Sequence, residues 1–429
     1  MFIPIQEAIK KGKGKVAIHG WIYRERKQKD MVFLVIRDST NIIQCVIKQD
    51  KVSKKEWEDA NKLLIESSLE IEGEIKEDKR APTGYEIQVS KLNVIQFSEV
   101  FPINKDQSPE LLLDNRHLWL RSRKLTAVMK VRSTVMKVFR EFYYNNGFHE
   151  MAPPIFTPNA CEGGSTLFEV KYFDKKMYLT QSWQLYAETA IFALEKIFCI
   201  SPCFRAEKSK TSRHLAEFWM AEMEAAWYDL DNLTKSAEEC VSYIIQSVVK
   251  ENSEELKLLG QDIEKLKKIK APFPRLKYND VLKLLKEKEK LNIPFGKDLR
   301  TVEEDLIMKH FDKPLIVTHY PKEIMAFYKP SDKKNPKEAL CFDMLAPEGY
   351  GEIIGGSQRD LDINELKKWL KKQGEKVENY EWYFDTRKYG SVMHGGYGLG
   401  IERVVAWLCK LDSIKDAIPF PRTMLRYIP

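Results

Sequence analysis

Short stretches of alternating hydrophobic and polar residues dominate the first hundred positions of the chain. Five of these stretches are rich in Val and Ile and predict β-strands, at residues 15–23, 31–38, 42–48, 68–75 and 85–95. A helical stretch at residues 53–67 precedes the fourth strand. Five short strands with one such interruption are typical of a small oligonucleotide-binding (OB) barrel, so we expect residues 1–100 to form one.

The hydrophobic pattern changes after this region. Residues 101–123 contain Pro102, Pro109 and several polar residues without a regular period, which predicts a hinge. Apolar residues then recur at helical spacing over residues 124–146 and predict a long helix that ends at Gly147. Residues 250–320 are helix-rich and carry many Lys and Glu residues, and we interpret them as a helical insertion without recognisable chemistry. The second domain is expected to span residues 124–429.

Composition limits the class of protein. A chain of 429 residues suggests two or three domains, and a net charge of +7 permits a polyanionic partner without requiring one. The seven cysteines are scattered without a CxxC pair, which favours reduced thiols over a zinc or redox site. We find no apolar run of membrane-spanning length and no signal-peptide pattern, so we expect no membrane association and a cytoplasmic location.

The predicted barrel carries side chains suited to RNA. Its exposed strand face is expected to combine cations for phosphate, an aromatic ring for a base and an amide for base edges. These residues are Arg24, Arg26, Lys27, Lys29, Phe33 and Gln44. The alternative is that Phe33 belongs to the core and that the lysines form a solvated loop.

Three separated segments together describe a pocket that handles phosphate. They read FRAEKSKTSRHLAEFW at residues 204–219, GEIIGGSQR at 351–359 and GGYGLGIER at 395–403. Each places arginine or carboxylates beside glycine or strand-forming residues. Arginine grips phosphate with two hydrogen bonds, carboxylates hold magnesium, and glycine lets the backbone approach a nucleotide. With an RNA-type barrel ahead of them, the three segments predict an enzyme that uses ATP and handles RNA.

The first segment predicts a hairpin of two strands, 201–207 and 216–227, joined by a basic loop. On this hairpin Arg205 would contact the α-phosphate and Phe218 would stack on adenine. Glu207 would lie near the adenine or the terminal RNA nucleotide. The loop offers further groups for pyrophosphate or an RNA end, namely Lys208, Lys210, Arg213 and His214. A surface hairpin held by ion pairs is the alternative.

These motifs resemble the class II aminoacyl-tRNA synthetases, in particular the aspartyl/asparaginyl subgroup and its archaeal-type asparaginyl branch. Residues 138–154 resemble the family's dimer-interface motif, 204–219 its second motif and 395–408 its third. The barrel sequence FLVIRDSTNIIQ and the closing PFPR also fit. The resemblance implies an α+β fold in which an N-terminal OB-fold barrel precedes an antiparallel β-sheet flanked by helices. It also implies a homodimer.

The resemblance further implies roles for single residues. Arg205 and Arg403 would bind phosphate, Asp343 and Glu352 would hold Mg²⁺, and ATP would bind in a bent form. Together with Arg205 and Phe218, the ATP-binding set comprises Glu207, His214, Glu352 and Arg403. Glu162 and Gln184 would orient the substrate's α-amino group, and the segment EGGSTL at residues 162–167 would close over it. In the barrel, Phe33 would stack on the middle anticodon base, with Gln44 and Arg26 beside it.

The choice of amino acid depends on three positions. Aspartyl enzymes have a lysine where this chain has Ala187, which shares a helical face with Gln184, so we expect the pocket to lack that cation. Glu222 would then accept a hydrogen bond from an amide NH2 and repel a carboxylate, while Arg359 would donate to the amide oxygen. Asparagine is the better fit. Met220, Met393 and Trp183 differ from the family pattern and would reshape the back wall of the pocket.

The expected function is therefore ATP-dependent ligation of asparagine to tRNA(Asn) through an asparaginyl-adenylate. Three alternatives stay open at this point. The first is an aspartyl-tRNA synthetase that does not discriminate between tRNAs, and the second is an adenylating asparagine synthetase that needs no tRNA. The third is a catalytically silent RNA-binding regulator.

Overall fold

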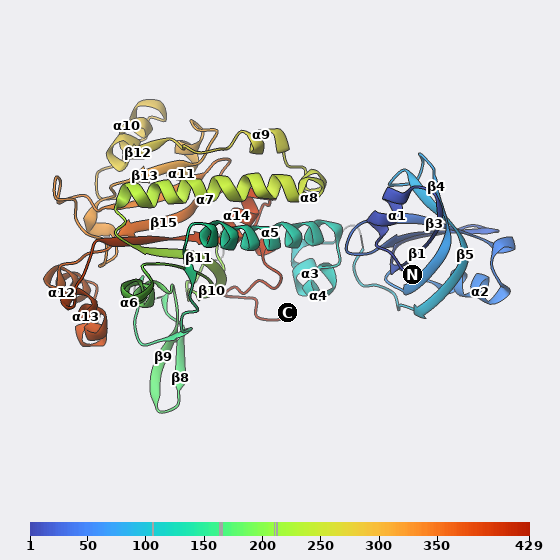
Figure 1. The fold of residues 1–429 in the computed structure, drawn as a ribbon, viewed down its shortest axis with the longest axis horizontal. Helices are drawn as coiled ribbons and strands as arrows, with labels where there is room; N and C mark the ends of the chain where they lie inside the picture. Colours follow the sequence, from blue (N-terminus) through green and yellow to red (C-terminus); the bar gives the residue numbers. More distant parts are fainter. Residues whose placement is uncertain (105–106, 163–165, 210, 212) are drawn as a thin grey trace. The chain divides into compact units, whose positions relative to one another are not determined.

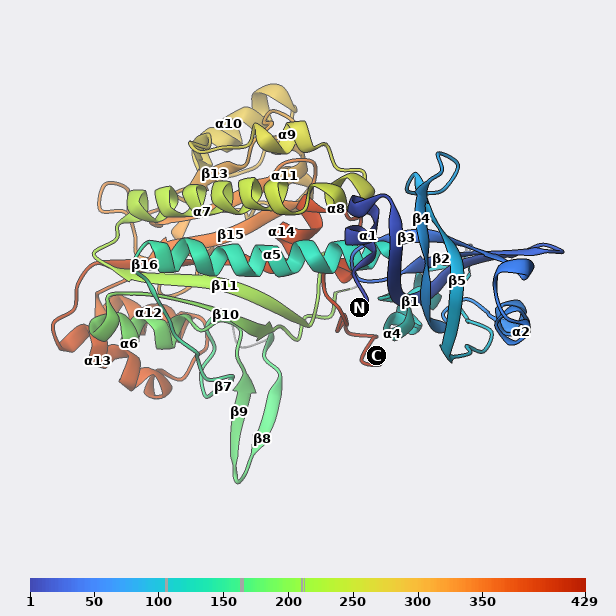
Figure 2. The same cartoon turned by 45° about the vertical axis from the view of Figure 1, so that its right-hand side comes forward.

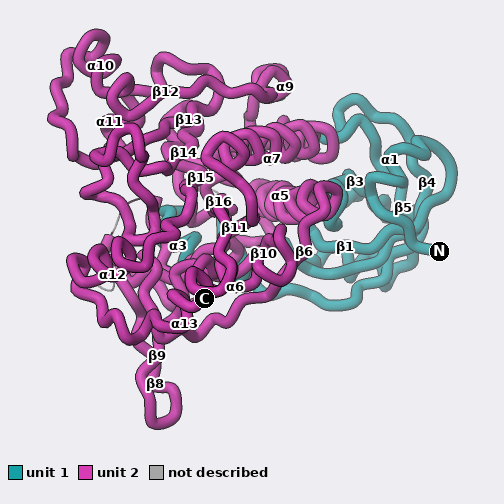
Figure 3. Tube along the Cα trace, turned by 60° about the vertical axis from the view of Figure 1, so that its left-hand side comes forward, with its two compact units in different colours: residues 1–118 teal, residues 119–429 magenta. Residues whose placement is uncertain are grey.

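The computed structural model describes residues 1–104, 107–162, 166–209, 211 and 213–429. The chain divides into two compact units, residues 1–118 and 119–429 (Figure 3).

Unit 1 contains the expected closed five-stranded barrel, with strand order β1-β2-β3-β5-β4. The strands are β1 (Gly14–Lys27), β2 (Met31–Arg37), β3 (Ile42–Lys48), β4 (Ser68–Glu77) and β5 (Tyr85–Gln96). The helix expected at 53–67 is shorter, α2 (Lys54–Lys62). Ser53 and Glu56 form a capping box at its start, and Leu63 is no longer helical. A further helix, α1 (Ile5–Lys11), was not predicted.

Alternation along β2 decides which side chains fill the barrel. Val32, Leu34 and Ile36 are fully buried, whereas Phe33 lies on the opposite face of the strand and is half-buried. The alternative in which Phe33 belongs to the barrel core is therefore wrong. Phe33 pairs in register with Arg26 on β1, and both side chains lie on the outer face of the barrel.

Unit 2 is built on an eight-stranded sheet with the order β12-β13-β14-β15-β16-β11-β10-β6. The six central strands are antiparallel to one another, and each of the two edge strands, β12 and β6, pairs in parallel with its single neighbour. In this order the strands are Arg275–Lys277, Leu315–Thr318, Cys341–Ala346, Gly351–Gln358, His394–Gly400, Glu217–Ala226, Lys196–Phe204 and His149–Glu150. The expected antiparallel sheet flanked by helices is confirmed.

Long amphipathic helices cover one face of this sheet. The helix α5 (Arg123–Asn145), predicted at 124–146, runs beside α7 (Leu230–Glu251) across the sheet, and α14 (Ile401–Leu408) packs with them (Figure 1). Their apolar faces and the strands between them form the largest hydrophobic cluster of the molecule. The helices α6 (Gln184–Leu194), α12 (Ile363–Lys372) and α13 (Glu381–Lys388) lie together at one end of the unit (Figure 2).

Two segments differ from their predicted structure. The expected hinge at 101–123 contains α3 (Pro109–Asp114) and α4 (Arg116–Trp119), because Ser108 caps a helix that begins at Pro109. The expected helical insertion contains the helices α8 (Ser253–Leu258), α9 (Ile263–Lys267), α10 (Tyr278–Lys288) and α11 (Thr301–Met308), but it also supplies β12 and β13 to the sheet. These strands are too short for their alternation to stand out in the sequence. No helix of the described residues is both long and apolar enough to cross a membrane.

Candidate active site

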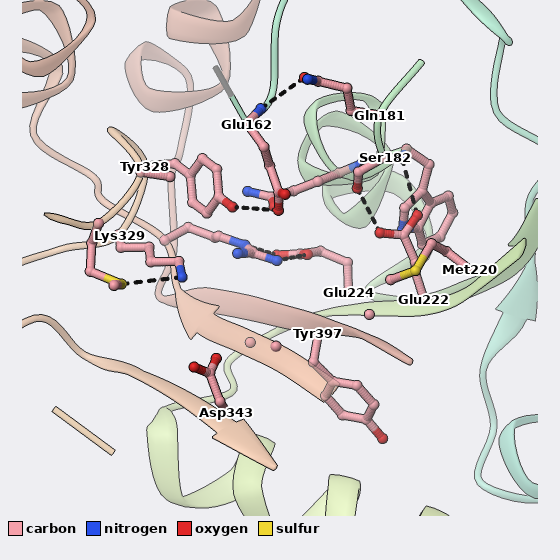
Figure 4. Close-up of a pocket in the computed structure, with 18 of the residues that line it drawn as sticks. Glu162, Gln181, Ser182, Met220, Glu222, Glu224, Tyr328, Lys329, Asp343 and Tyr397 are labelled. Carbon is pink, nitrogen blue, oxygen red and sulfur yellow. Dashed lines mark hydrogen bonds and ion pairs between the residues drawn. The ribbon is translucent and has the colours of Figure 1, made fainter. Parts of the chain in front are cut away.

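A cavity of about 780 Å³ opens above β11, β15 and β16 (Figure 4). Most of the predicted amino-acid and metal residues line it, namely Glu162, Gln184, Glu222, Asp343, Glu352 and Arg359, and the predicted phosphate-binding residue Arg205 lines it as well. They come from segments up to about two hundred positions apart, which the sheet brings together. The third motif contributes Tyr397 and Gly398 to the lining, and its Gly396 lies against the buried Glu224. A Cβ built on Gly396 would lie 2.1 Å from Glu224 Oε2, so only glycine leaves room for that carboxylate.

Arg359 is held in a buried pair. Its Nε and Nη2 donate to the two oxygens of Glu224 at 2.9 and 2.7 Å, and its Nη1 donates to Ser357 Oγ at 2.9 Å. Behind this pair, Glu188 accepts from Tyr383, Gln184 and Arg387. Burial alone would raise the pKa of Glu188, but the charges of Arg387 and its other partners lower it below its ordinary value. Arg359 thus offers the cavity a hydrogen-bond donor in a fixed position, and the Glu224 carboxylate already balances its positive charge.

Glu222 lies in the same cavity without a cationic partner. It accepts hydrogen bonds from Ser182 Oγ at 2.6 Å and from the Trp183 backbone N–H at 3.1 Å, and it forms no ion pair with any described residue. Burial raises its pKa to about 7, against the effect of these two hydrogen bonds. A carboxylate accepts about four hydrogen bonds, so capacity remains for an incoming amide.

The structure places Ala187 outside the cavity, which corrects one expectation. Ala187 is fully buried in an apolar cluster with Trp183, Ile191 and Ile197, and it is absent from the described residues that line the cavity. Gln184 does line the cavity, but the helix turns Ala187 toward the sheet instead. The bulky Trp183 fills this cluster while its backbone N–H faces Glu222.

Glu162 and Arg205 contact each other in this structure. Arg205 Nη2 donates to Glu162 Oε2 at 2.6 Å, and Tyr328 OH donates to Glu162 Oε1 at 3.4 Å. The Arg205 guanidinium also lies over the Phe218 ring, 5.5 Å from its centre, and its Nε is buried without a hydrogen-bond partner. Arg205 lines the cavity, and a buried guanidinium N–H without a partner is suited to an anion.

A second cavity, of about 120 Å³, adjoins the first. All six residues predicted to bind ATP line it: Arg205, Glu207, His214, Phe218, Glu352 and Arg403. The two cavities share Arg205, Met220, Glu352 and Gly398, so a ligand can extend from one into the other. The predicted strand pairing is confirmed, although β10 ends at Phe204 and leaves Arg205 and Glu207 just beyond the strand.

Asp343 and Glu352 stand close together on neighbouring strands. A Cβ on Gly355 would lie 2.9 Å from Glu352 Oε1 and 3.5 Å from Asp343 Oδ1, so both oxygens surround one small space. Burial raises the pKa of Asp343 well above its ordinary value, and the Glu352 carboxylate raises it further. A divalent cation would relieve this repulsion, and Mg²⁺ is commonly held by one or two carboxylates together with substrate phosphates. The two side chains therefore fit a Mg²⁺ ion.

Several residues of the site were missed by sequence reasoning. Asp298 lines the large cavity, and Glu304 lies near Glu352 with a pKa raised to about 7 by burial. Both come from the segment that was interpreted as an insertion without chemistry, which is wrong. Tyr328 and Lys329 also line the cavity and follow no recognisable motif. Glu224 is different, because the alternation of the strand places it on the same face as Glu222 and so indicates a second carboxylate in the pocket; only its pairing with Arg359 was not expected.

Two predicted groups lie partly outside the described residues. The closing segment at 162–167 is described only at Glu162, Thr166 and Leu167, and the basic loop is not described at Lys210. Within the loop, His214 Nε2 lies 3.4 Å from Glu207, and burial lowers the pKa of His214. Arg213 donates to Asp305 at 3.1 Å.

In the barrel, Arg26, Phe33 and Gln44 share the outer face. The Arg26 guanidinium lies 4.6 Å from the centre of the Phe33 ring. Gln44, on the next strand, donates to Glu86 at 2.9 Å. The face thus combines a cation, a ring and an amide, as predicted from the sequence.

The chain resembles known proteins over nearly its whole length. The family of class II tRNA synthetases (D, K and N) matches residues 108–424, and the OB-fold nucleic acid binding domain matches residues 16–95. The asparagine–tRNA ligase of Thermoplasma acidophilum is 48% identical over 415 residues, covering 97% of this chain and 96% of that protein. The asparagine–tRNA ligase of Lactobacillus gasseri is 43% identical, covering 100% of this chain and 99% of that protein.

A solved structure agrees with these relatives. The crystal structure of asparaginyl-tRNA synthetase from Pyrococcus horikoshii complexed with asparaginyl-adenylate matches with a TM-score of 0.96 and 47% identity, and covers 100% of both chains. The cavities, the barrel and these matches lead to one conclusion: the chain belongs to the class II tRNA synthetases of the D, K and N group.

Proposed function

We propose that this enzyme ligates asparagine to tRNA(Asn) at the expense of ATP. The observation that carries the proposal is the pairing of charges in the amino-acid cavity. Arg359 is offset by Glu224, whereas Glu222 has no cationic partner among the described residues. A neutral carboxamide can accept from Arg359 and donate to Glu222, but an aspartate carboxylate would meet an excess of negative charge. The asparagine–tRNA ligases among the relatives support the same choice.

The first step forms an asparaginyl-adenylate. An oxygen of the α-carboxylate attacks the α-phosphorus of ATP, and the bond to the β-phosphate oxygen breaks and releases pyrophosphate. Arg205 lies where the two cavities meet and would bind the α-phosphate, while Glu162 and Gln184 would receive the α-ammonium group. Positioning and charge neutralisation provide the catalysis, because the nucleophile is already an anion.

The nucleotide would occupy the second cavity. Arg403, Glu207, His214 and Phe218 line that cavity, with Phe218 available to stack on adenine. Asp343 and Glu352 would hold Mg²⁺, which supplies neutralisation of the phosphate charge. In the second step the 3′-hydroxyl of the terminal tRNA adenosine attacks the carbonyl carbon, and AMP leaves.

The outer face of the barrel would bind the anticodon. Phe33 would stack on a base, Gln44 would contact a base edge, and Arg26 would approach phosphate. We further propose a homodimer in the cytoplasm. Residues 138–154 resemble the dimer motif, and all seven cysteines are unpaired and buried, as expected in a reducing compartment.

Two assays test this function. Pyrophosphate–ATP exchange with each of the twenty amino acids should respond to asparagine, with aspartate far weaker. Charging of tRNA(Asn) should then proceed with asparagine alone. Efficient charging with aspartate would show a non-discriminating aspartyl enzyme. ATP-dependent formation of free asparagine from aspartate and ammonia without RNA would show an adenylating asparagine synthetase. The absence of exchange with every amino acid would show a catalytically silent RNA-binding regulator.

A further inference from the structure

A small hairpin projects from unit 2 and takes no part in the cavities described above. It consists of β8 (Glu169–Tyr172) and β9 (Lys175–Leu179), and β7 (Phe156–Thr157) pairs with β9 to give a sheet with the order β7-β9-β8. Figures 1 and 2 show it standing away from the body of the unit. None of its strand residues lines either cavity of the active site.

One face of the hairpin exposes aromatic rings. Tyr172 is paired with Lys175, and Phe156 with Leu179, so alternation places these four side chains on the same face. Phe156 is 43% exposed, Tyr172 39% and Phe173, at the tip, 80%. The ring centres of Phe156 and Tyr172 lie 5.7 Å apart, and those of Tyr172 and Phe173 lie 4.9 Å apart. The three rings form a continuous apolar platform in solvent.

The tip holds Phe173 in an unfavourable backbone conformation. Phe173 and Asp174 form a two-residue loop, and Phe173 has a φ of 54° where hairpin loops favour glycine. A bulky residue with positive φ is uncommon, and such positions gather at sites of function. Strain together with high exposure indicates a ring retained for a contact outside the chain.

The hairpin also carries cations that are only partly neutralised. Lys171 lies directly opposite Lys176, an arrangement that destabilises a strand pair. Lys176 is paired with Glu169 at 2.5 Å, but Lys171 and Lys175 form no ion pair with any described residue. Exposed rings beside unpaired lysines have the composition of a surface that binds single-stranded nucleic acid.

We propose that this hairpin, residues 169–179, binds the acceptor end of the tRNA. The inference rests on the proposed function, which requires the RNA 3′ end to enter the amino-acid cavity. β9 leads directly into Gln181 and Ser182 of that cavity. The base of the hairpin is fixed near the site by a hydrogen bond from the Phe204 backbone N–H to the Thr180 carbonyl at 2.9 Å. Seven extended residues place the tip about 23 Å from Thr180, a distance that a few nucleotides can span.

The test uses Phe173→Gly in the full chain. Glycine suits the positive φ, so this variant removes the ring without disturbing the turn. We expect the KM for tRNA(Asn) in charging to rise about tenfold, the loss of one stacked base. Asparagine-dependent pyrophosphate–ATP exchange should stay unchanged. The matched control is Tyr389→Ala, which removes a ring that is 78% exposed at the end of α13 and should leave the KM for tRNA as it is.

A direct binding measurement keeps the two proposals separate. Fluorescence anisotropy with an RNA hairpin that carries the acceptor stem and the 3′ single strand should show about tenfold weaker binding to Phe173→Gly. An anticodon stem-loop should bind both proteins equally. Unchanged binding of the acceptor RNA overturns the hairpin proposal. Loss of the dimer in Phe173→Gly, measured by analytical ultracentrifugation, also overturns the hairpin proposal. In that case the aromatic rings would contact a second copy of the chain. A wild-type protein that fails to charge tRNA refutes the proposed function instead, and the anisotropy result still decides the role of the hairpin.

Discussion

The two adjoining cavities of unit 2 hold similar charged side chains but arrange them differently. In the amino-acid cavity, Arg359 is 6% exposed and is fixed by two hydrogen bonds to Glu224. In the nucleotide cavity, Arg403 is half-buried and donates from Nη1 to the backbone carbonyl of Glu352 at 2.7 Å. Buried pairs fix the geometry and exclude a wrong charge, whereas a less buried guanidinium keeps donors for a ligand that brings its own charge. In the proposed function, selectivity would come from a guanidinium that is buried and paired, and nucleotide binding from one that keeps donors for the ligand.

The largest effect is expected from removing one partner of the buried pair. Arg359→Leu leaves Glu224 buried without its guanidinium, which should lower the free energy of unfolding by about 3–5 kcal/mol and abolish asparagine-dependent exchange. Urea-induced unfolding of the full chain measures the first quantity. The double variant Arg359→Leu/Glu224→Leu should recover most of the stability without the activity. Equal stability of the single variant and the wild type would contradict the role given to the pair.

The nucleotide cavity should respond in the opposite way. Arg403→Gln should change the free energy of unfolding by less than about 1 kcal/mol, because the side chain is half-buried. The rate of pyrophosphate–ATP exchange should fall about 100-fold, as for the loss of one donor to a transition-state charge. Lys410→Gln, which removes an exposed cation just after α14, is the control and should leave exchange intact. An Arg403→Gln protein that exchanges normally would exclude Arg403 from phosphate binding.

Discrimination against aspartate should depend on pH through Glu222. Burial raises the pKa of Glu222 from 4.5 to about 7, so the repelling carboxylate is present above that pH and is lost as the pH falls. The ratio of asparagine-dependent to aspartate-dependent exchange should therefore rise between pH 6 and pH 8, by at most about tenfold per unit. Glu222→Gln should remove this dependence. A ratio that does not vary with pH in the wild type would show that Glu222 does not repel the wrong substrate.

The same pKa fixes the sign of a stability effect. Between pH 4.5 and about 7 the folded chain keeps the Glu222 proton that the unfolded chain has released. The folded state therefore binds more protons, and the contribution of Glu222 to the free energy of unfolding decreases as the pH rises through this window. The pKa of Glu304 is also raised to about 7, so Glu304 adds a similar pH dependence. The contribution of Glu222 is therefore the difference in the free energy of unfolding between the wild type and Glu222→Gln, measured across this pH range.

The smallest effect concerns the Glu162–Arg205 ion pair, where the two cavities meet. The α-ammonium group of asparagine would bind Glu162 in place of Arg205, and Arg205 would then be available to bind the phosphate of ATP. Each substrate should therefore strengthen the binding of the other by about fivefold. In Glu162→Gln, ATP alone should bind more tightly and asparagine more weakly, and the mutual effect should disappear. Calorimetric titration with each substrate, alone and in the presence of the other, measures this. Glu375→Gln, which removes another carboxylate of the same cavity, should keep the coupling.

Much of the fold follows from the local pattern of the chain. The five barrel strands and α5 were predicted within a few residues, because alternation and helical spacing are strong signals over such lengths. The gathering of Arg205, Glu352 and Arg403 was also expected, since each sits in a motif with glycine or a strand beside it. β12 and β13 were not predicted, because strands of three and four residues carry little periodicity of their own.

The sequence by itself determined the barrel and α5, because these depend on local periodicity, and its motifs indicated the chemical character of the second cavity. The antiparallel sheet was expected only from the resemblance of these motifs to a known family. Only the tertiary structure decided which charges are neutralised. Glu224 and Arg359 are 135 positions apart, and their pairing depends on β11 and β15 lying on either side of β16. The tertiary structure also turned Ala187 away from the cavity and left Glu222 without a cation. Electrostatic pairing depends on distances in space, which no spacing along the chain records.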